Sequence, residues 1–121
     1  MIFFNCDPAI DAVKTVVHAA TAEEVKATPA GSLVVMPFDR SALSFYKTAG
    51  IPLAIRVGSV KEYLLIMGTG ATYALASKAL APALQKIAEE YLSDTKVIVE
   101  IENEDQIPWA AARGIDGVFV A

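Results

Sequence analysis

The sequence has almost no cysteine or histidine, and its charge is not basic. One Cys and one His occur among 121 residues, so an internal disulfide is impossible and a disulfide-stapled secreted scaffold is excluded. Ten Lys and Arg stand against fourteen Asp and Glu, and this acidic balance argues against binding to a nucleic-acid backbone. No cluster of His and Cys has the spacing of a zinc site, so we expect neither a metal nor a cofactor.

Long hydrophobic runs are also missing, although 55% of the residues are hydrophobic. No uncharged apolar run approaches the roughly 18 residues that a membrane-spanning helix needs. Residues 1–8 lack the basic and long apolar parts of a signal peptide. Without a linker or a low-complexity tract, the sequence predicts a single domain over residues 1–121. We expect a cytoplasmic protein that binds neither membranes nor nucleic acid.

The most informative pattern is a repeat of about twenty residues. Short, nearly continuous apolar runs follow Gly31, Gly50, Gly70 and Gly114. Such runs are typical of parallel strands that are covered on both faces. A glycine just before each run is typical of a helix that ends in the left-handed conformation. The runs cover residues 14–19, 32–36, 51–57, 71–76, 95–101 and 115–120, and residues 1–5 are a seventh strand candidate.

Helical signals lie between the apolar runs. Thr21 and Glu24 have the spacing of a capping box, and Ser59 can cap the helix that follows it. Pro82 falls in the first turn of the longest predicted helix, where a missing N–H group costs little. The longer predicted helices cover residues 42–48, 60–67, 78–92 and 104–113.

Strands and helices therefore alternate, which predicts an α/β fold with a mostly parallel sheet of about six strands. We favour a three-layer open sandwich of the flavodoxin or Rossmann kind. An incomplete (βα)-barrel-like curved sheet is the alternative, because the units follow one another so evenly. Residues 70–77 and 114–121 are similar to the Gly-Ala-Asp-x-Val-x-Val junctions of phosphate-binding TIM barrels, a resemblance of unit geometry that carries no catalytic motif. A full barrel needs eight units and about 250 residues.

Polar side chains collect where the predicted strands end, which is the edge where open parallel sheets bind ligands. Gly58 and Ser59 form a strand-to-helix turn whose N–H groups suit an anion. Arg56 can present its guanidinium group to a carboxylate or phosphate, or it can pair with Glu100 within the sheet. The residues we expect to bind a ligand are Asp39, Arg56, Gly58, Ser59, Ser77, Lys78 and Glu100.

His18 is the one candidate catalytic residue. It ends an apolar run, and a carboxylate from Asp39 or Glu100 would orient it as a general base; the alternative is a hydrogen-bonded or solvent-facing side chain. Cys6 precedes a predicted helix start that would stabilise a thiolate, but it has no CxxC partner, so an inert thiol is the favoured interpretation.

Two functions remain open at this point. The lack of a complete catalytic constellation favours a small non-catalytic domain with a binding or self-assembly role. The alternative is an enzyme, or the remnant of one, that binds a small anionic or phosphorylated metabolite at the C-terminal edge of the sheet. Apolar strands at both ends of the sequence favour coverage by a second copy, so we expect a homodimer.

Overall fold

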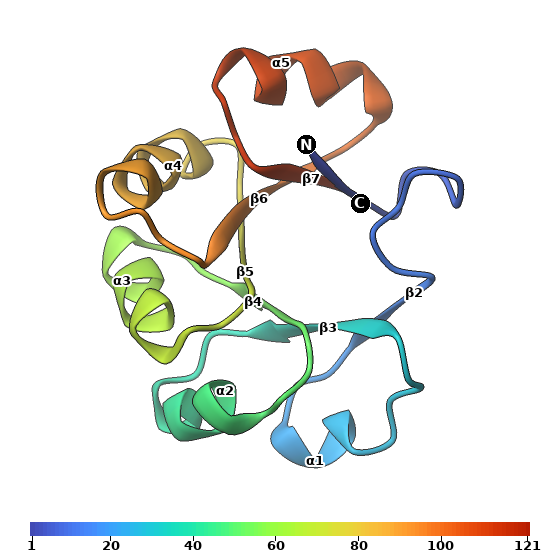
Figure 1. The fold of residues 1–121 in the computed structure, drawn as a ribbon, viewed down its shortest axis with the longest axis vertical. Coiled ribbons are helices and arrows are strands. Elements are labelled where there is room, and N and C mark those ends of the chain that lie inside the picture. Colours follow the sequence, from blue (N-terminus) through green and yellow to red (C-terminus); the bar gives the residue numbers. More distant parts are fainter.

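A computed structural model describes residues 1–121 and shows one sheet of seven parallel strands (Figure 1). The strand order is β1-β7-β6-β5-β4-β3-β2, and all six neighbouring pairs run parallel. The expected parallel α/β fold is therefore confirmed, with the N-terminal candidate as its seventh strand. The strands are β1 (Ile2–Phe4), β2 (Thr15–His18), β3 (Ser32–Pro37), β4 (Leu53–Arg56), β5 (Tyr73–Ala76), β6 (Lys96–Ile101) and β7 (Gly117–Val120).

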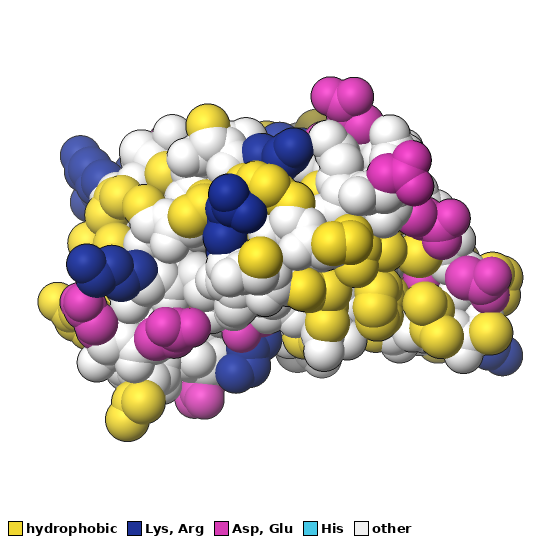
Figure 2. All heavy atoms as spheres, turned by 90° about the horizontal axis from the view of Figure 1, so that it is seen from above, with side chains coloured by type: hydrophobic (Ala, Val, Ile, Leu, Met, Phe, Trp, Pro, Cys, Tyr) yellow, Lys and Arg dark blue, Asp and Glu magenta, His cyan; other side chains and the backbone are white.

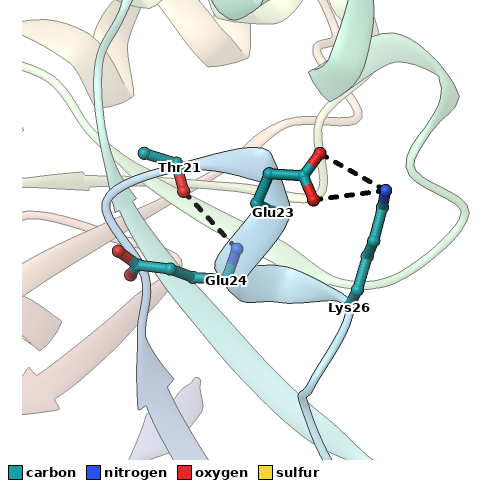
Figure 3. Close-up of polar contacts among 4 residues, drawn as sticks. All are labelled: Thr21, Glu23, Glu24 and Lys26. Carbon is teal, nitrogen blue, oxygen red and sulfur yellow. Dashed lines mark hydrogen bonds and ion pairs between the residues drawn. The ribbon is translucent and has the colours of Figure 1, made fainter.

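Two helix caps that the sequence predicts are present, whereas the longest predicted helix begins at Ala81, three residues later than its predicted start at Lys78. The Glu24 N–H group donates to Thr21 Oγ1 at 3.4 Å (Figure 3), and the Glu62 N–H group donates to Ser59 Oγ at 3.2 Å. None of the helices is long and apolar enough to span a membrane. They are α1 (Ala22–Val25), α2 (Leu43–Thr48), α3 (Val60–Thr69), α4 (Ala81–Glu90) and α5 (Ile107–Ala112), and 3₁₀ turns (Arg40–Ala42, Glu104–Gln106) precede α2 and α5.

The glycines of the repeat end their units in the left-handed conformation, as expected. Gly70 caps α3 with φ 74°, and its N–H group donates to the Met67 carbonyl. This φ is sterically unfavourable for residues with a Cβ atom, which explains why glycine recurs at these positions. The φ angles of Gly31, Gly50 and Gly114 are 81°, 70° and 65°.

From β2 to β7 the strand order follows the chain without a reversal. Successive crossovers of the same hand put every helix on the same side of the sheet. Figure 1 shows the result, a sheet that curls with all five helices outside it. Of the two closures that the sequence left open, the incomplete barrel describes this sheet, because a three-layer sandwich would have helices on both faces. In open parallel sheets, ligands bind beyond the carboxyl ends of the strands, especially where the strand order reverses. Because the order here never reverses, only the edge formed by the carboxyl ends of the strands indicates where a ligand site would lie.

Apolar side chains fill both faces of the curled sheet. The larger cluster, of 22 buried residues, lies between the sheet and the helices. The smaller cluster consists only of strand residues, which places it on the inner face of the curl. The inside is therefore a packed core and not a pore. The inner cluster comprises Phe4, Leu33, Val35, Ala54, Leu75, Ile98 and Phe119.

The barrel stays open between its two edge strands, β1 and β2. Residues 5–14 join these edges without adding a strand, and one backbone bond, from the Ala12 N–H group to the Phe3 carbonyl, ties the segment to β1. Asp11 Oδ1 stabilises the turn by accepting from the N–H groups of Cys6 and Asp7. The seam is thus bridged by a turn, not by an eighth strand.

Candidate functional site at the carboxyl edge of the sheet

A hollow of about 790 Å³ opens at the carboxyl edge of the strands. The segments that follow β3, β4, β5 and β6 form its walls, so its position agrees with the edge that the sequence pointed to. Five of the seven residues expected to bind a ligand line it: Arg56, Gly58, Ser77, Lys78 and Glu100. The other lining residues are Pro37, Phe38, Val57, Glu62, Ala79, Ile101, Glu102 and Ala121.

Arg56 and Glu100 form an ion pair across the intervening strand β5. Each follows an inner-face residue, Ala54 or Ile98, by two positions, so both side chains point to the inner side of the curl. The pair is partly exposed, with 45% of the Arg56 side chain and 29% of the Glu100 side chain accessible. The pairing interpretation is confirmed, and an anionic ligand at Arg56 would have to compete with Glu100.

The turn formed by Gly58 and Ser59 is already occupied by groups of the protein. Ser59 Oγ caps α3, and the Gly58 N–H group donates to Glu62 Oε1 at 2.9 Å. The N–H group that was expected to meet an anion therefore already meets a carboxylate, and Ser59 lies outside the hollow. Sequence reasoning missed Glu62, although the spacing from Ser59 to Glu62 is that of a capping box.

Ser77 and Lys78 lie between β5 and α4, at the amino end of that helix. The chain has two ion pairs, Lys26–Glu23 and Arg56–Glu100, so the Lys78 ammonium group has no carboxylate partner. Its Nζ lies 4.9 Å from the centre of the Trp109 ring, a cation–π contact that holds the side chain beside the hollow. Lys78 is thus the cation of this hollow that remains available to a ligand.

Trp109 lies in α5, and two cations contact its ring. The Arg113 guanidinium carbon is 4.3 Å from its ring centre, and Arg113 also donates to the Trp109 carbonyl at 3.0 Å. Nothing in the sequence pattern joined Lys78 to Trp109, because the contact depends on how α5 sits beside the β5–α4 turn.

The acidic side of the hollow has one carboxylate without a partner. Glu100 pairs with Arg56 and Glu62 accepts from Gly58, whereas Glu102 is in neither ion pair of the chain. The hollow therefore presents one free ammonium group, one free carboxylate, the Ser77 hydroxyl group and apolar walls. No group of three or more His, Cys, Asp or Glu side chains is arranged to hold a metal ion.

Asp39 and His18 lie outside the main hollow. Asp39 Oδ1 accepts from the Ser41 N–H and hydroxyl groups, at 2.9 and 2.7 Å, and these bonds hold the pKa of the carboxyl group below its usual value. His18 lines a neighbouring hollow of about 320 Å³, which shares Arg56 and Pro37 with the first. Because Asp39 and Glu100 are bonded elsewhere, neither orients the His18 ring, and a catalytic role for His18 stays a prediction.

The Cys6 side chain is held as a neutral thiol. Its Sγ donates to Glu104 Oε1 at 3.2 Å, and this hydrogen bond, followed by desolvation and nearby carboxylates, raises the pKa of Cys6 to about 11. Ionising the thiol would place two negative charges side by side. The environment therefore fits the inert thiol that the sequence favoured.

No protein-family model matches this chain, and no curated protein matches its sequence. A functional proposal must therefore be built on the geometry of the carboxyl edge.

Proposed function

We propose that this protein is a non-catalytic binding domain for a small metabolite that carries a phosphate or carboxylate group. The observation that supports this most directly is the unpaired ammonium group of Lys78 beside the Ser77 hydroxyl group, in a hollow of about 790 Å³. Ligand sites for small molecules have volumes of roughly 300–1,000 Å³ and combine apolar walls with a few polar groups.

Each part of the hollow has a role in such binding. The ligand's anionic group meets the Lys78 ammonium group and the Ser77 hydroxyl group. Phe38 and Val57 contact the apolar part of the ligand, and the Glu102 carboxylate accepts from a hydroxyl or amino group. The Arg56–Glu100 pair helps to hold β4 and β6 at the rim, and its guanidinium group is a secondary contact for the anion.

A thermal-shift series tests this proposal. Inorganic phosphate, a sugar phosphate, a nucleotide and a dicarboxylate are added at matched ionic strength, and at least one should raise the Tm. Lys78→Gln should abolish the shift, whereas Lys86→Gln, on an exposed position of α4, should retain it. Ser59→Ala should lower the Tm of the free protein through loss of the helix cap but leave the ligand-induced shift intact. No shift with any of the four compounds would contradict the proposal.

The enzymatic alternative depends on His18, whose hollow adjoins the main one through Arg56. Once a ligand is known, its turnover is followed in the wild type and in His18→Gln. Turnover that disappears in the variant while binding persists would replace the non-catalytic proposal with an enzymatic one. Equal stability of the ligand with and without the protein would remove the alternative.

We also propose self-association through the open side of the barrel. β1 and β2 each have a partner strand on one side only. Figure 2 shows hydrophobic side chains gathered on the side of the molecule where Figure 1 has β1 and residues 5–14. Met1 and Ile10, from this part of the chain, are 49% and 52% exposed. Unpaired edges beside exposed apolar groups favour pairing with a second copy.

A further inference from the structure

The charged side chains that line the carboxyl hollow do not favour a purely anionic ligand. Two of them are cations and three are carboxylates, and the whole chain has a net charge of −4. A ligand with several negative charges would therefore meet more like charges than opposite charges in this hollow, which is unfavourable. The five side chains are Arg56, Glu62, Lys78, Glu100 and Glu102.

Three of these five side chains are already bonded within the protein. Arg56 and Glu100 form an ion pair with each other, and Glu62 Oε1 accepts from the Gly58 N–H group at 2.9 Å. The side chains of Lys78 and Glu102 take part in neither ion pair of the chain, and they do not pair with each other. The charges that a ligand meets without breaking a bond of the protein are thus one positive and one negative.

Lys78 and Glu102 follow neighbouring strands at the same edge of the sheet. β5 and β6 are parallel with Ala76 opposite Val99, and Lys78 and Glu102 come shortly after these two residues. Neighbouring strands lie about 4.8 Å apart, so the two charged residues leave the sheet at adjacent points of its edge. A small ligand can therefore contact both of them from within one hollow.

The backbone is held by hydrogen bonds at both places. The Ser77 carbonyl accepts from the Ala81 N–H group at 2.9 Å, and the Glu102 N–H group donates to Gln106 Oε1 at 2.7 Å. Glu102 is exposed and Lys78 is partly exposed, so both side chains are accessible to a ligand.

We propose that the ligand of this hollow is a zwitterion, a small molecule that carries an ammonium group as well as its phosphate or carboxylate group. This inference rests on the proposed function, because the anionic group is the one that meets Lys78. The ligand's ammonium group donates to the Glu102 carboxylate, a charge-assisted hydrogen bond. Both unpaired charges of the hollow are then neutralised while the Arg56–Glu100 pair stays intact. A ligand with only anionic groups would leave Glu102 without a partner.

The test compares ω-aminoalkyl phosphates and ω-amino carboxylic acids of graded chain length with counterparts in which a methyl group replaces the ammonium group. Calorimetry at matched ionic strength measures binding to the full chain. NMR signals of Lys78, of Glu102 and of the indole N–H group of Trp109, the single tryptophan, locate the binding site. At least one amine should bind about fivefold to tenfold more tightly than its methyl counterpart, as expected for one charge-assisted hydrogen bond.

Three variants separate the two charged contacts. Glu102→Gln should remove the preference for the amine, while the methyl counterpart binds at least as tightly as before. Asp105→Asn is the matched control and should keep the preference, because Asp105 is an exposed carboxylate that follows the same strand but does not line the hollow. Lys78→Gln should weaken the binding of both members of each pair.

The outcomes distinguish this inference from the proposed function. Equal affinity for amines and methyl counterparts, with binding of both lost in Lys78→Gln, would overturn the zwitterionic ligand and leave the anion site in place. A preference for the amine that persists in Glu102→Gln would also overturn it. Binding of neither member of any pair to the wild type would contradict the anion site itself, and this inference with it.

Discussion

Two buried threonine hydroxyl groups differ in their hydrogen bonding, and the difference predicts opposite effects on stability. Thr95 is 1% exposed and donates to the Ala71 carbonyl, whereas Thr28 Oγ1 has no partner. Thr95→Val should lower the free energy of unfolding by about 1–3 kcal/mol, because the carbonyl loses its donor. Thr28→Val should change it by less than about 0.5 kcal/mol or raise it, because no bond is lost. Urea denaturation measures both, and equal losses would contradict the assignment.

Cys6 predicts a dependence of reactivity on pH. With its pKa raised to about 11, the thiol is nearly all protonated at pH 8, and alkylation by iodoacetamide should accelerate about tenfold for each pH unit up to that value. Glu104→Ala removes the main cause of the shift, so the midpoint should move down toward the ordinary 9.0. Glu90→Ala, on α4, is the control and should leave the midpoint in place. A wild-type midpoint near 9 would show that the Cys6–Glu104 bond does not persist in solution.

At the scale of elements, the attachment of β1 depends on a single glycine in β7. A Cβ atom at Gly117 would lie 2.7 Å from the Ile2 carbonyl oxygen and 2.7 Å from Ile98 Cδ1, so β1 can approach only because no side chain is there. Gly117→Ala should therefore push β1 away and lower the free energy of unfolding by about 1–3 kcal/mol. Amide hydrogen exchange should increase most in Ile2–Phe4.

Gly68 in α3 provides the matched control. Its added Cβ would meet nothing within 4 Å, and its φ lies outside the left-handed region. Gly68→Ala should raise the free energy of unfolding by about 0.5–1 kcal/mol, because alanine loses less backbone entropy in a helix. If Gly117→Ala and Gly68→Ala lower the free energy of unfolding equally, the close approach of β1 to β7 does not explain why position 117 is a glycine.

At the scale of the whole molecule, the open seam predicts a dimer. Sedimentation at micromolar concentration should give twice the mass of the 12.8 kDa chain. Thr15→Lys places a charge on the edge strand β2, at an exposed position, and a charge on an edge strand opposes its pairing with another strand. The variant should shift the mass toward the monomer, while Thr72→Lys, an exposed position beside the central strand β5, should not. A wild-type monomer at this concentration would refute self-association.

Some contacts at the site could be predicted from local sequence, and others could not. The ion pair of Arg56 and Glu100 was foreseen because a charge inside an apolar run must find a partner or reach water. Asp39 and His18 were placed at the correct edge but not in the main hollow. Their positions depend on the turn after β3, where Asp39 binds Ser41, and on the place of β2 at the edge of the sheet.

The sequence by itself determined the order of strands and helices, the helix caps and the left-handed glycine ends, because each follows from interactions within a few neighbouring residues. It also determined which residues meet at the carboxyl rim, since parallel strands all end on the same side. Only the tertiary structure decided that the sheet curls with every helix outside and that Trp109 lies beneath Lys78. These features depend on strand order and on packing between distant segments, and local patterns of hydrophobicity carry no information about either.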